Sequence, residues 1–198
     1  SIRRQRQMCI RDRHYSGYNK GKTWTAFAIR GFDAEDPSFI IKPAEMSKKW
    51  KAENEARLSA KCGPTVIAEK FPTAMTVANR IPGAKERVRF MRLAAGGGEL
   101  TRHADITDPD AGTKDGQLCR LHIPLRSAEA CKFHSWGLEG EELELHFAER
   151  ALCYLDTRKP HAVTNPAEIE RVHLVLDTFA SAELRAMLIG GGASAAAG

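Results

Sequence analysis

Between residues 87 and 178 the chain is a series of short segments in which polar and apolar side chains alternate. Successive side chains of a β-strand point to opposite faces, so this alternation predicts strands. Segments of this kind include 87–93, 117–125, 130–135, 143–147, 152–156, 162–165 and 172–176. Many short strands at close intervals predict a mainly β domain, a sandwich or barrel of the jelly-roll type.

The part of the chain before residue 87 predicts one strand and two flanking helical segments. Residues 22–30 are rich in aromatic and β-branched side chains that alternate, which indicates a strand. Residues 43–60 and 65–81 have a helical composition, the second with a break or a start at Pro72. We therefore expect a single domain over residues 14–188, with an N-terminal part at 14–86 and a β core at 87–178. The small-residue tail 189–198 is expected to be disordered.

The first thirteen residues do not look like part of this domain. The run from Arg3 to Arg13 is polar, dense in arginine and without any periodicity. It resembles, over its whole length, the translation of a transposon-end adapter used in sequencing libraries. We therefore expect residues 1–13 to be an adapter-derived scar and leave them out of the fold prediction.

Leaving out the scar changes the electrostatic interpretation. The full chain has 30 Lys and Arg against 25 Asp and Glu, a net charge of +5. The scar contains five Arg and one Asp, which leaves 25 basic against 24 acidic residues and a net charge of +1. The basic excess therefore gives no support to a nucleic-acid partner. No apolar run approaches the roughly 20 residues of a membrane helix, so we expect no membrane partner.

The cysteines predict a reducing compartment. Outside the scar they are Cys62, Cys119, Cys131 and Cys153, and none forms a CxxC pair. Free thiols are the expectation, and with them a cytoplasmic location.

Three residues of the β core form a candidate metal site. His103 and Asp105 are two apart, so in a strand both point to one face. His161 follows 58 residues later, after a Lys-Pro pair. Two histidines and one carboxylate on one face of a metal leave the opposite positions open, which is typical of non-heme Fe(II) oxygenases. A lone His-x-Asp pair is a weak signal, and it is His161 with its neighbours that strengthens it.

Three further residues are candidates for binding an anion. Arg171 begins an apolar strand, where a buried cation needs a partner such as a dicarboxylate or a structural salt bridge. Arg120 and His122 share a strand face, and two neighbouring donors favour an anion. Arg92 is compatible with a pocket or with the surface. His134, His146 and His173 are expected to be structural or exposed, and Asn165 to cap the turn after His161.

Four stretches of this core resemble the aspartyl/asparaginyl β-hydroxylase family, in the same order and spacing. They are Leu93–Asp105, Arg120–Leu125, Tyr154–Asn165 and Arg171–Asp177. The most specific pieces are Arg-x-His-Ile-Pro-Leu, which is the second stretch, and His-x-Val-x-Asn, which ends the third. The resemblance covers nearly half of the chain. It implies a double-stranded β-helix (jelly-roll, cupin-like) and the activity of an Fe(II)- and 2-oxoglutarate-dependent dioxygenase.

The resemblance also implies roles for individual residues. His103, Asp105 and His161 match the iron ligands; some family members lack the carboxylate, and its presence aligns this chain with bacterial small-molecule hydroxylases. Arg171 matches the arginine that pairs with the distal carboxylate of 2-oxoglutarate. Arg120 and His122 match a pair that lines the cosubstrate or substrate carboxylate. O2 is the second cosubstrate, and the implied products are a hydroxylated compound, succinate and CO2.

Two other classes of function stay open at this point. One is a non-catalytic cupin-like metal-binding protein, which does not need Arg171. The other is a metalloenzyme on the same barrel that does not use 2-oxoglutarate. Within the hydroxylase hypothesis the substrate is a free amino acid, or an aspartyl or asparaginyl residue of a peptide, and the single domain without peptide-binding repeats favours the small molecule.

Overall fold

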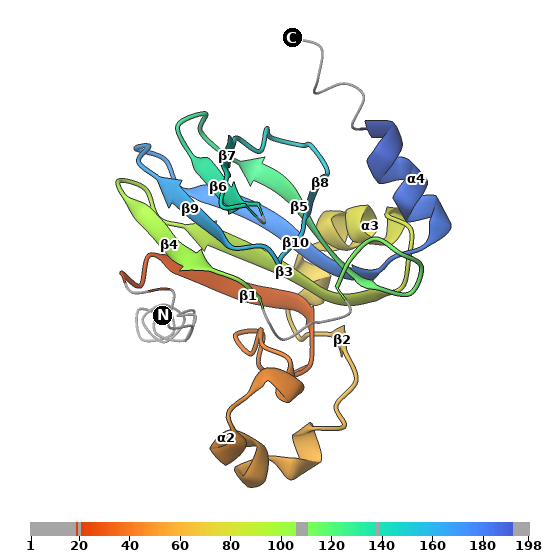
Figure 1. The fold of residues 1–198 in the computed structure, drawn as a ribbon. Helices are drawn as coiled ribbons and strands as arrows, with labels where there is room; N and C mark the ends of the chain where they lie inside the picture. Colours follow the sequence, from red (N-terminus) through yellow and green to blue (C-terminus); the bar gives the residue numbers. More distant parts are fainter. Residues whose placement is uncertain (1–18, 20, 106–110, 138, 192–198) are drawn as a thin grey trace.

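Two antiparallel β-sheets face each other in the computed structural model, which describes residues 19, 21–105, 111–137 and 139–191 (Figure 1). The six-stranded sheet has the order β2-β1-β3-β10-β5-β8, and the four-stranded sheet the order β4-β9-β6-β7. Strands that are distant in the sequence therefore lie side by side, as in a double-stranded β-helix. The predicted fold class, mainly β with flanking helices, is confirmed.

Each predicted strand is present, with its ends shifted by a few residues. The larger sheet contains β1 (Trp24–Gly31), β2 (Gly63–Pro64), β3 (Lys85–Leu93), β5 (Leu118–Arg126), β8 (Cys153–Leu155) and β10 (Arg171–Phe179). The smaller sheet contains β4 (Gly98–His103), β6 (Lys132–Trp136), β7 (Glu142–Leu145) and β9 (His161–Asn165). The turn between β3 and β4 places Gly96 and Gly97 at φ +64° and +100°, a region that favours glycine.

Both faces of the larger sheet are buried, in two separate cores. The inner core lies between the sheets and includes Met91 of β3, Phe133 of β6 and Val163 of β9. The outer core includes Leu174 and Leu176 of β10, which alternate with the inward residues of the same strand. A strand such as β10 therefore sends every second side chain into the space where the candidate site lies.

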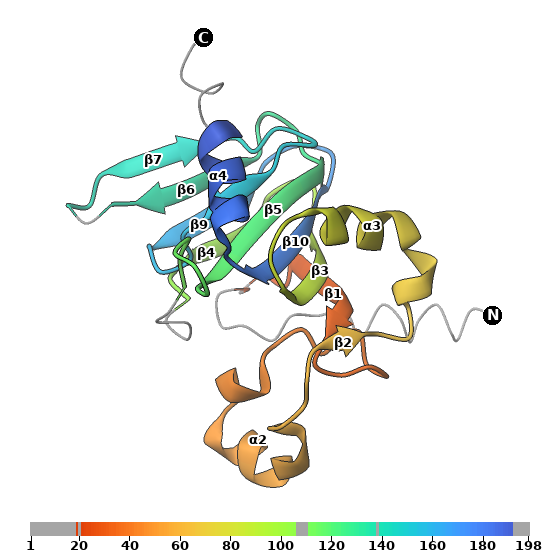
Figure 2. The ribbon, with the colours of Figure 1, turned by 90° about the vertical axis from the view of Figure 1, so that its right-hand side faces the viewer.

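Two helices cover the outer face of the larger sheet, as Figures 1 and 2 show. They are α3 (Pro72–Arg80), which starts at the predicted Pro72, and α4 (Ala182–Gly191). Ala78 of α3 and Leu184 of α4 are fully buried in the outer core. None of the helices in the described part of the chain has the length and apolar character that crossing a membrane requires.

The predicted helical segment 43–60 is not one helix. It forms the 3-10 turns η1 (Pro43–Glu45) and η2 (Glu55–Arg57) on either side of the six-residue α2 (Lys48–Glu53). No residue of α2 is buried, and Figure 1 shows this segment apart from the sheets. Helices gain most of their stability from packing an apolar face, so a segment without such packing does not extend. A third turn, η3 (Ala68–Lys70), precedes α3.

The structure also bears on the chain ends and the cysteines. Helix α4 was not predicted, and it runs through residue 191, three residues into the segment expected to be disordered. Residues 192–198 and the expected scar at 1–13 lie outside the described residues. The four cysteines of the described chain are free thiols, as expected.

We predict that α4 is an integral part of the fold. Leu184→Ala is expected to lower the free energy of unfolding by about 2–5 kcal/mol, because it removes a fully buried side chain and leaves a cavity. Met187→Ala on the same helix, where the side chain is 44% exposed, is expected to change it by less than about 0.5 kcal/mol. Urea unfolding of both variants measures this, and equal effects would contradict the packing of α4.

Candidate active site

The three predicted metal ligands come together at the end of the smaller sheet where β4 stops and β9 begins. His103 ends β4 and His161 begins β9, and the two residues are directly paired in the strand register. Asp105 follows β4 by two residues. One donor atom from each of the three side chains lies within 4.8 Å of the other two. This spacing allows the three side chains to bind a single metal ion.

Backbone contacts orient both histidines for metal binding. His103 Nδ1 lies 2.7 Å from the carbonyl oxygen of Thr101, and His161 Nδ1 lies 2.9 Å from that of Lys159. Because a carbonyl oxygen only accepts, each Nδ1 carries the proton and each Nε2 keeps its lone pair for a metal. Burial lowers the pKa of His161 to about 4, so the ring is neutral at physiological pH.

These residues line a cavity of about 300 Å³ between the two sheets. Leu100, Phe133 and Val163 form part of its apolar wall. Its polar lining also contains the three predicted anion-binding residues Arg120, His122 and Arg171. All six predicted site residues therefore share one cavity.

Arg120 is already engaged by two carboxylates. Its Nε donates to Asp177 Oδ1 at 2.8 Å, and its Nη1 donates to Asp105 Oδ2. Burial opposes ionisation of Asp105, but the positive charge of Arg120 outweighs it and lowers the pKa of the Asp105 carboxyl. Arg120 therefore holds the predicted metal ligand in place and keeps it ionised.

Arg171 lies at the other end of the cavity without such a partner. It is 5% exposed, its Nε has no hydrogen-bond partner, and it forms no ion pair with the residues that the structure describes. Burial lowers its pKa to about 10. An unpaired buried cation is unfavourable, so this position is suited to an anionic ligand.

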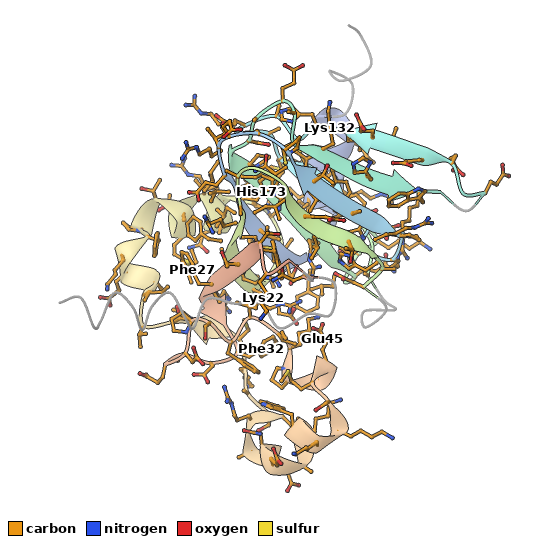
Figure 3. All side chains as sticks on the ribbon, turned by 90° about the vertical axis from the view of Figure 1, so that its left-hand side faces the viewer. Lys22, Phe27, Phe32, Glu45, Lys132 and His173 are labelled. Atoms are coloured by element: carbon orange, nitrogen blue, oxygen red, sulfur yellow. The ribbon has the colours of Figure 1, made fainter. Side chains whose placement is uncertain are left out.

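His122 and His173 form a buried pair close to Arg171. Their Nδ1 atoms are 3.2 Å apart, and the Nε2 atom of each has no partner among the described residues. Burial, and then Arg171, lower both pKa values well below the usual range. Figure 3 labels His173 within the body of the two sheets. It is structural, as expected, but it contacts a residue of the cavity.

Two arginines of the cavity were not recognised in the sequence. Arg87 and Arg89 of β3 are 2% and 3% exposed, and both contact the fully buried Asp177. Burial opposes ionisation of Asp177, but Arg120, Arg87 and Arg89 outweigh it and hold its pKa well below the usual range. The sequence feature that could have revealed these two arginines is Asp177, because a carboxylate on the inner face of a buried strand requires cations nearby.

The remaining candidates lie outside the cavity. Arg92 is on the surface and pairs with Glu170. His134 pairs with Glu142, and His146 Nδ1 lies 3.2 Å from the Cys131 carbonyl oxygen. Asn165 is buried, and its Nδ2 donates to the carbonyl oxygens of Ala94 and Ile169.

The geometry agrees with a comparison against protein families. The family model described as aspartyl/asparaginyl beta-hydroxylase matches residues 3–180. The chain belongs to the aspartyl/asparaginyl beta-hydroxylase family. The match covers both sheets and every candidate site residue, so the resemblance inferred from four short stretches of the core is confirmed. A search of curated proteins found no match.

Solved structures similar to this family member are distant. A 2OG-Fe(II) oxygenase family oxidoreductase from Burkholderia pseudomallei is 15% identical, with a TM-score of 0.44, over 79% of this chain and 68% of that one. A prolyl-4-hydroxylase from Pseudomonas putida is 13% identical, with a TM-score of 0.41, over 91% and 84%. A cupin domain from Bordetella pertussis is 17% identical, with a TM-score of 0.34, over 51% and 88%. The assignment rests on the family match.

We predict that Asp177 stabilises the fold through its three arginines. Asp177→Asn is expected to lower the free energy of unfolding by about 3–5 kcal/mol, because it leaves the buried Arg89 without a charged partner and removes one from each of Arg87 and Arg120. The control is Asp156→Asn, since Asp156 pairs with the half-exposed Arg158 and its loss is expected to cost about 0–1 kcal/mol. Chemical denaturation compares the two, and a similar small loss for both would contradict this account.

We also predict that stability falls as the pH drops from 6.5 towards 5. The pKa values of His122, His161 and His173 are lowered in the folded state, so the unfolded chain, with histidine pKa near 6.5, takes up protons first. Each histidine then contributes a loss of up to about 1.4 kcal/mol per pH unit. Urea unfolding at several pH values measures the slope, which His173→Gln should reduce by about one third. A flat profile would contradict the prediction.

Proposed function

We propose that this protein is an Fe(II)- and 2-oxoglutarate-dependent hydroxylase that acts on an amino acid or on an aspartyl or asparaginyl residue. The observation that supports it most is one cavity with a potential metal site at one end and an unpaired buried arginine, Arg171, at the other. The family match supports a hydroxylase.

The donor set suits Fe(II). His103 and His161 offer neutral nitrogen and Asp105 a charged oxygen, a mixed set on one side of a potential ion. Arg120 fixes the carboxylate, and the backbone carbonyl oxygens of Thr101 and Lys159 fix the imidazole rings. The three side chains are thus held ready to bind the ion by partners outside the metal site.

The opposite end of the cavity suits a dicarboxylate. Arg171 is the residue that would pair with the distal carboxylate of 2-oxoglutarate, and His122 Nε2, also without a partner in the described chain, lines the same cavity. The guanidinium fork binds a carboxylate through two hydrogen bonds, which sets the orientation as well as the affinity. Binding there would supply the negative charge that the burial of Arg171 requires.

Bound together, Fe(II) and 2-oxoglutarate supply the oxidising chemistry that hydroxylates a C–H bond with O2, giving succinate and CO2. The chain's own part is to bind, orient and exclude water. Phe133 stacks on His161 with ring centroids 5.7 Å apart and an interplanar angle of 17°, which restricts the ring that would face the metal. Leu100 and Val163 line the same space with apolar side chains.

Two other functions remain as outcomes of the test. A cupin-like metal-binding protein needs the three metal ligands but has no use for a buried unpaired Arg171. A metalloenzyme that does not use 2-oxoglutarate would turn over substrate without succinate. The dependence of succinate formation on Arg171 separates these from the proposed hydroxylase.

We predict that the protein, reconstituted with Fe(II) without oxygen, forms succinate from 2-oxoglutarate when O2 is admitted. His161→Ala is expected to abolish this by removing a metal ligand. Arg171→Ala is expected to raise the KM for 2-oxoglutarate by about tenfold or more, because it removes a charge-assisted bidentate contact. Succinate is measured with and without each member of an amino-acid panel.

Matched controls lie on the same sheets. His134→Ala removes a histidine of β6 that pairs with Glu142, and Arg92→Ala removes an exposed arginine of β3 that pairs with Glu170. Both are expected to keep wild-type turnover. Iron binding without succinate across the panel would contradict the proposal and favour the metal-binding protein.

A further inference from the structure

The cavity contains more positive charge than the proposed cosubstrate needs. Besides Arg171, three arginines surround the single carboxylate of Asp177: Arg87, Arg89 and Arg120. Each guanidinium can donate up to five hydrogen bonds, so one carboxylate does not satisfy three of them. The question is which of the three has capacity left for a ligand.

Arg87 and Arg120 each have several partners, although the Nη2 atom of Arg87, 2.7 Å from Asp177 Oδ2, forms no hydrogen bond with the described residues. Arg87 Nε donates to Asp177 Oδ2 at 2.7 Å, its Nη1 donates to the Ile40 carbonyl oxygen at 3.1 Å, and Glu45 Oε2 lies 3.8 Å from Nη1. Glu45 lies on the side of the sheets that faces α2 (Figure 3). Arg120 has both Asp105 and Asp177.

Arg89 has fewer partners than the other two, because among the described residues it forms an ion pair with Asp177 alone. Its Nη2 donates to Asp177 Oδ2 at 2.6 Å, and that oxygen also accepts from Arg87. Its Nε has no hydrogen-bond partner among the described residues, although the residue is 3% exposed and lines the cavity. Burial, and then the repulsion of Arg87, lower its pKa to about 9, so the charged form is held at a cost that an anion would relieve.

Arg89 and Arg171 lie at different positions along the cavity, because the guanidinium of Arg89 contacts Asp177, six residues along β10 from Arg171. Arg89 of β3 is paired with Val175 of β10, four residues along that strand from Arg171. At about 3.3 Å per residue the two positions are about 13 Å apart. In the proposed function one end of 2-oxoglutarate lies at the metal and the other at Arg171, which leaves Arg89 with only the Asp177 oxygen that it shares with Arg87.

We propose that Arg89 binds a carboxylate of the primary substrate, which makes that substrate a small carboxylic acid, such as a free amino acid, or an acidic side chain. This inference rests on the proposed function, because it assigns the second anion site of the same cavity. It predicts that substrate binding depends on the negative charge of the substrate and on Arg89 of β3.

Binding is measured without turnover, by calorimetry on the full chain with Fe(II) and 2-oxoglutarate in the absence of oxygen. The panel consists of the twenty common L-amino acids and a blocked aspartyl peptide, and each ligand that binds is compared with its uncharged amide. We expect at least one carboxylate to bind, with its amide weaker by about tenfold or more. Arg89→Gln should weaken the carboxylate by a similar factor and leave the amide nearly unchanged.

Three variants control this experiment. Arg92→Gln changes an arginine of the same strand that faces outward, and is expected to bind as the wild type does. Arg89→Lys keeps the charge without the fork and is expected to retain part of the affinity, which separates loss of charge from loss of fold. Arg171→Ala is expected to lose 2-oxoglutarate, whereas Arg89→Gln should keep it.

Equal binding of acid and amide, equal affinities for Arg89→Gln and Arg92→Gln, or no binding by any panel member would each overturn the inference. Repeating the titrations without 2-oxoglutarate separates the two proposals. If 2-oxoglutarate itself does not bind, the proposed function fails. The titrations without 2-oxoglutarate then test the inference alone: a carboxylate that binds to the wild type and more weakly to Arg89→Gln supports it, and equal binding to both overturns it.

Discussion

The candidate site depends on one buried carboxylate, that of Asp177. This residue of β10 is fully buried and contacts Arg87 and Arg89 of β3 on one side and Arg120 of β5 on the other. Three neighbouring strands are thus joined by charge-assisted hydrogen bonds in a low-dielectric interior, where a missing partner would be costly. Arg120 extends the network to Asp105, so the carboxylate of the potential metal site is oriented from the opposite sheet.

The network also explains the polarity of the cavity. Arg120 is neutralised by two carboxylates, whereas Arg171 and part of Arg89 are not, and the histidines beside them are kept neutral by burial. The result is a space of about 300 Å³ with a potential metal site and two separated positions of unbalanced positive charge. Such a cavity favours small anionic ligands, because their negative charge balances the positive charge that the protein's own carboxylates do not neutralise.

The sequence predicted much of this arrangement, because alternation in short strands is a local property. It predicted β3, β5, β9 and β10 and brought His103, Asp105 and His161 to one place. It did not reveal Arg87 and Arg89, since arginines that alternate with apolar residues usually face solvent, whereas here both faces of β3 are buried. Helix α4 was missed because its Ala- and Gly-rich end resembles a tail, and only packing on the sheet stabilises it.

The two faces of β10 make the site depend on packing that is remote from it. Arg171, His173 and Asp177 point inward, whereas Leu174 and Leu176 point into the outer core with Ala78 of α3 and Leu184 of α4. A slip of one residue would exchange the two sets and place three polar side chains under the helices. The apolar contacts of α3 and α4 therefore fix the register that aligns Asp177 with Arg120 and, through Arg120, holds Asp105 at the metal site.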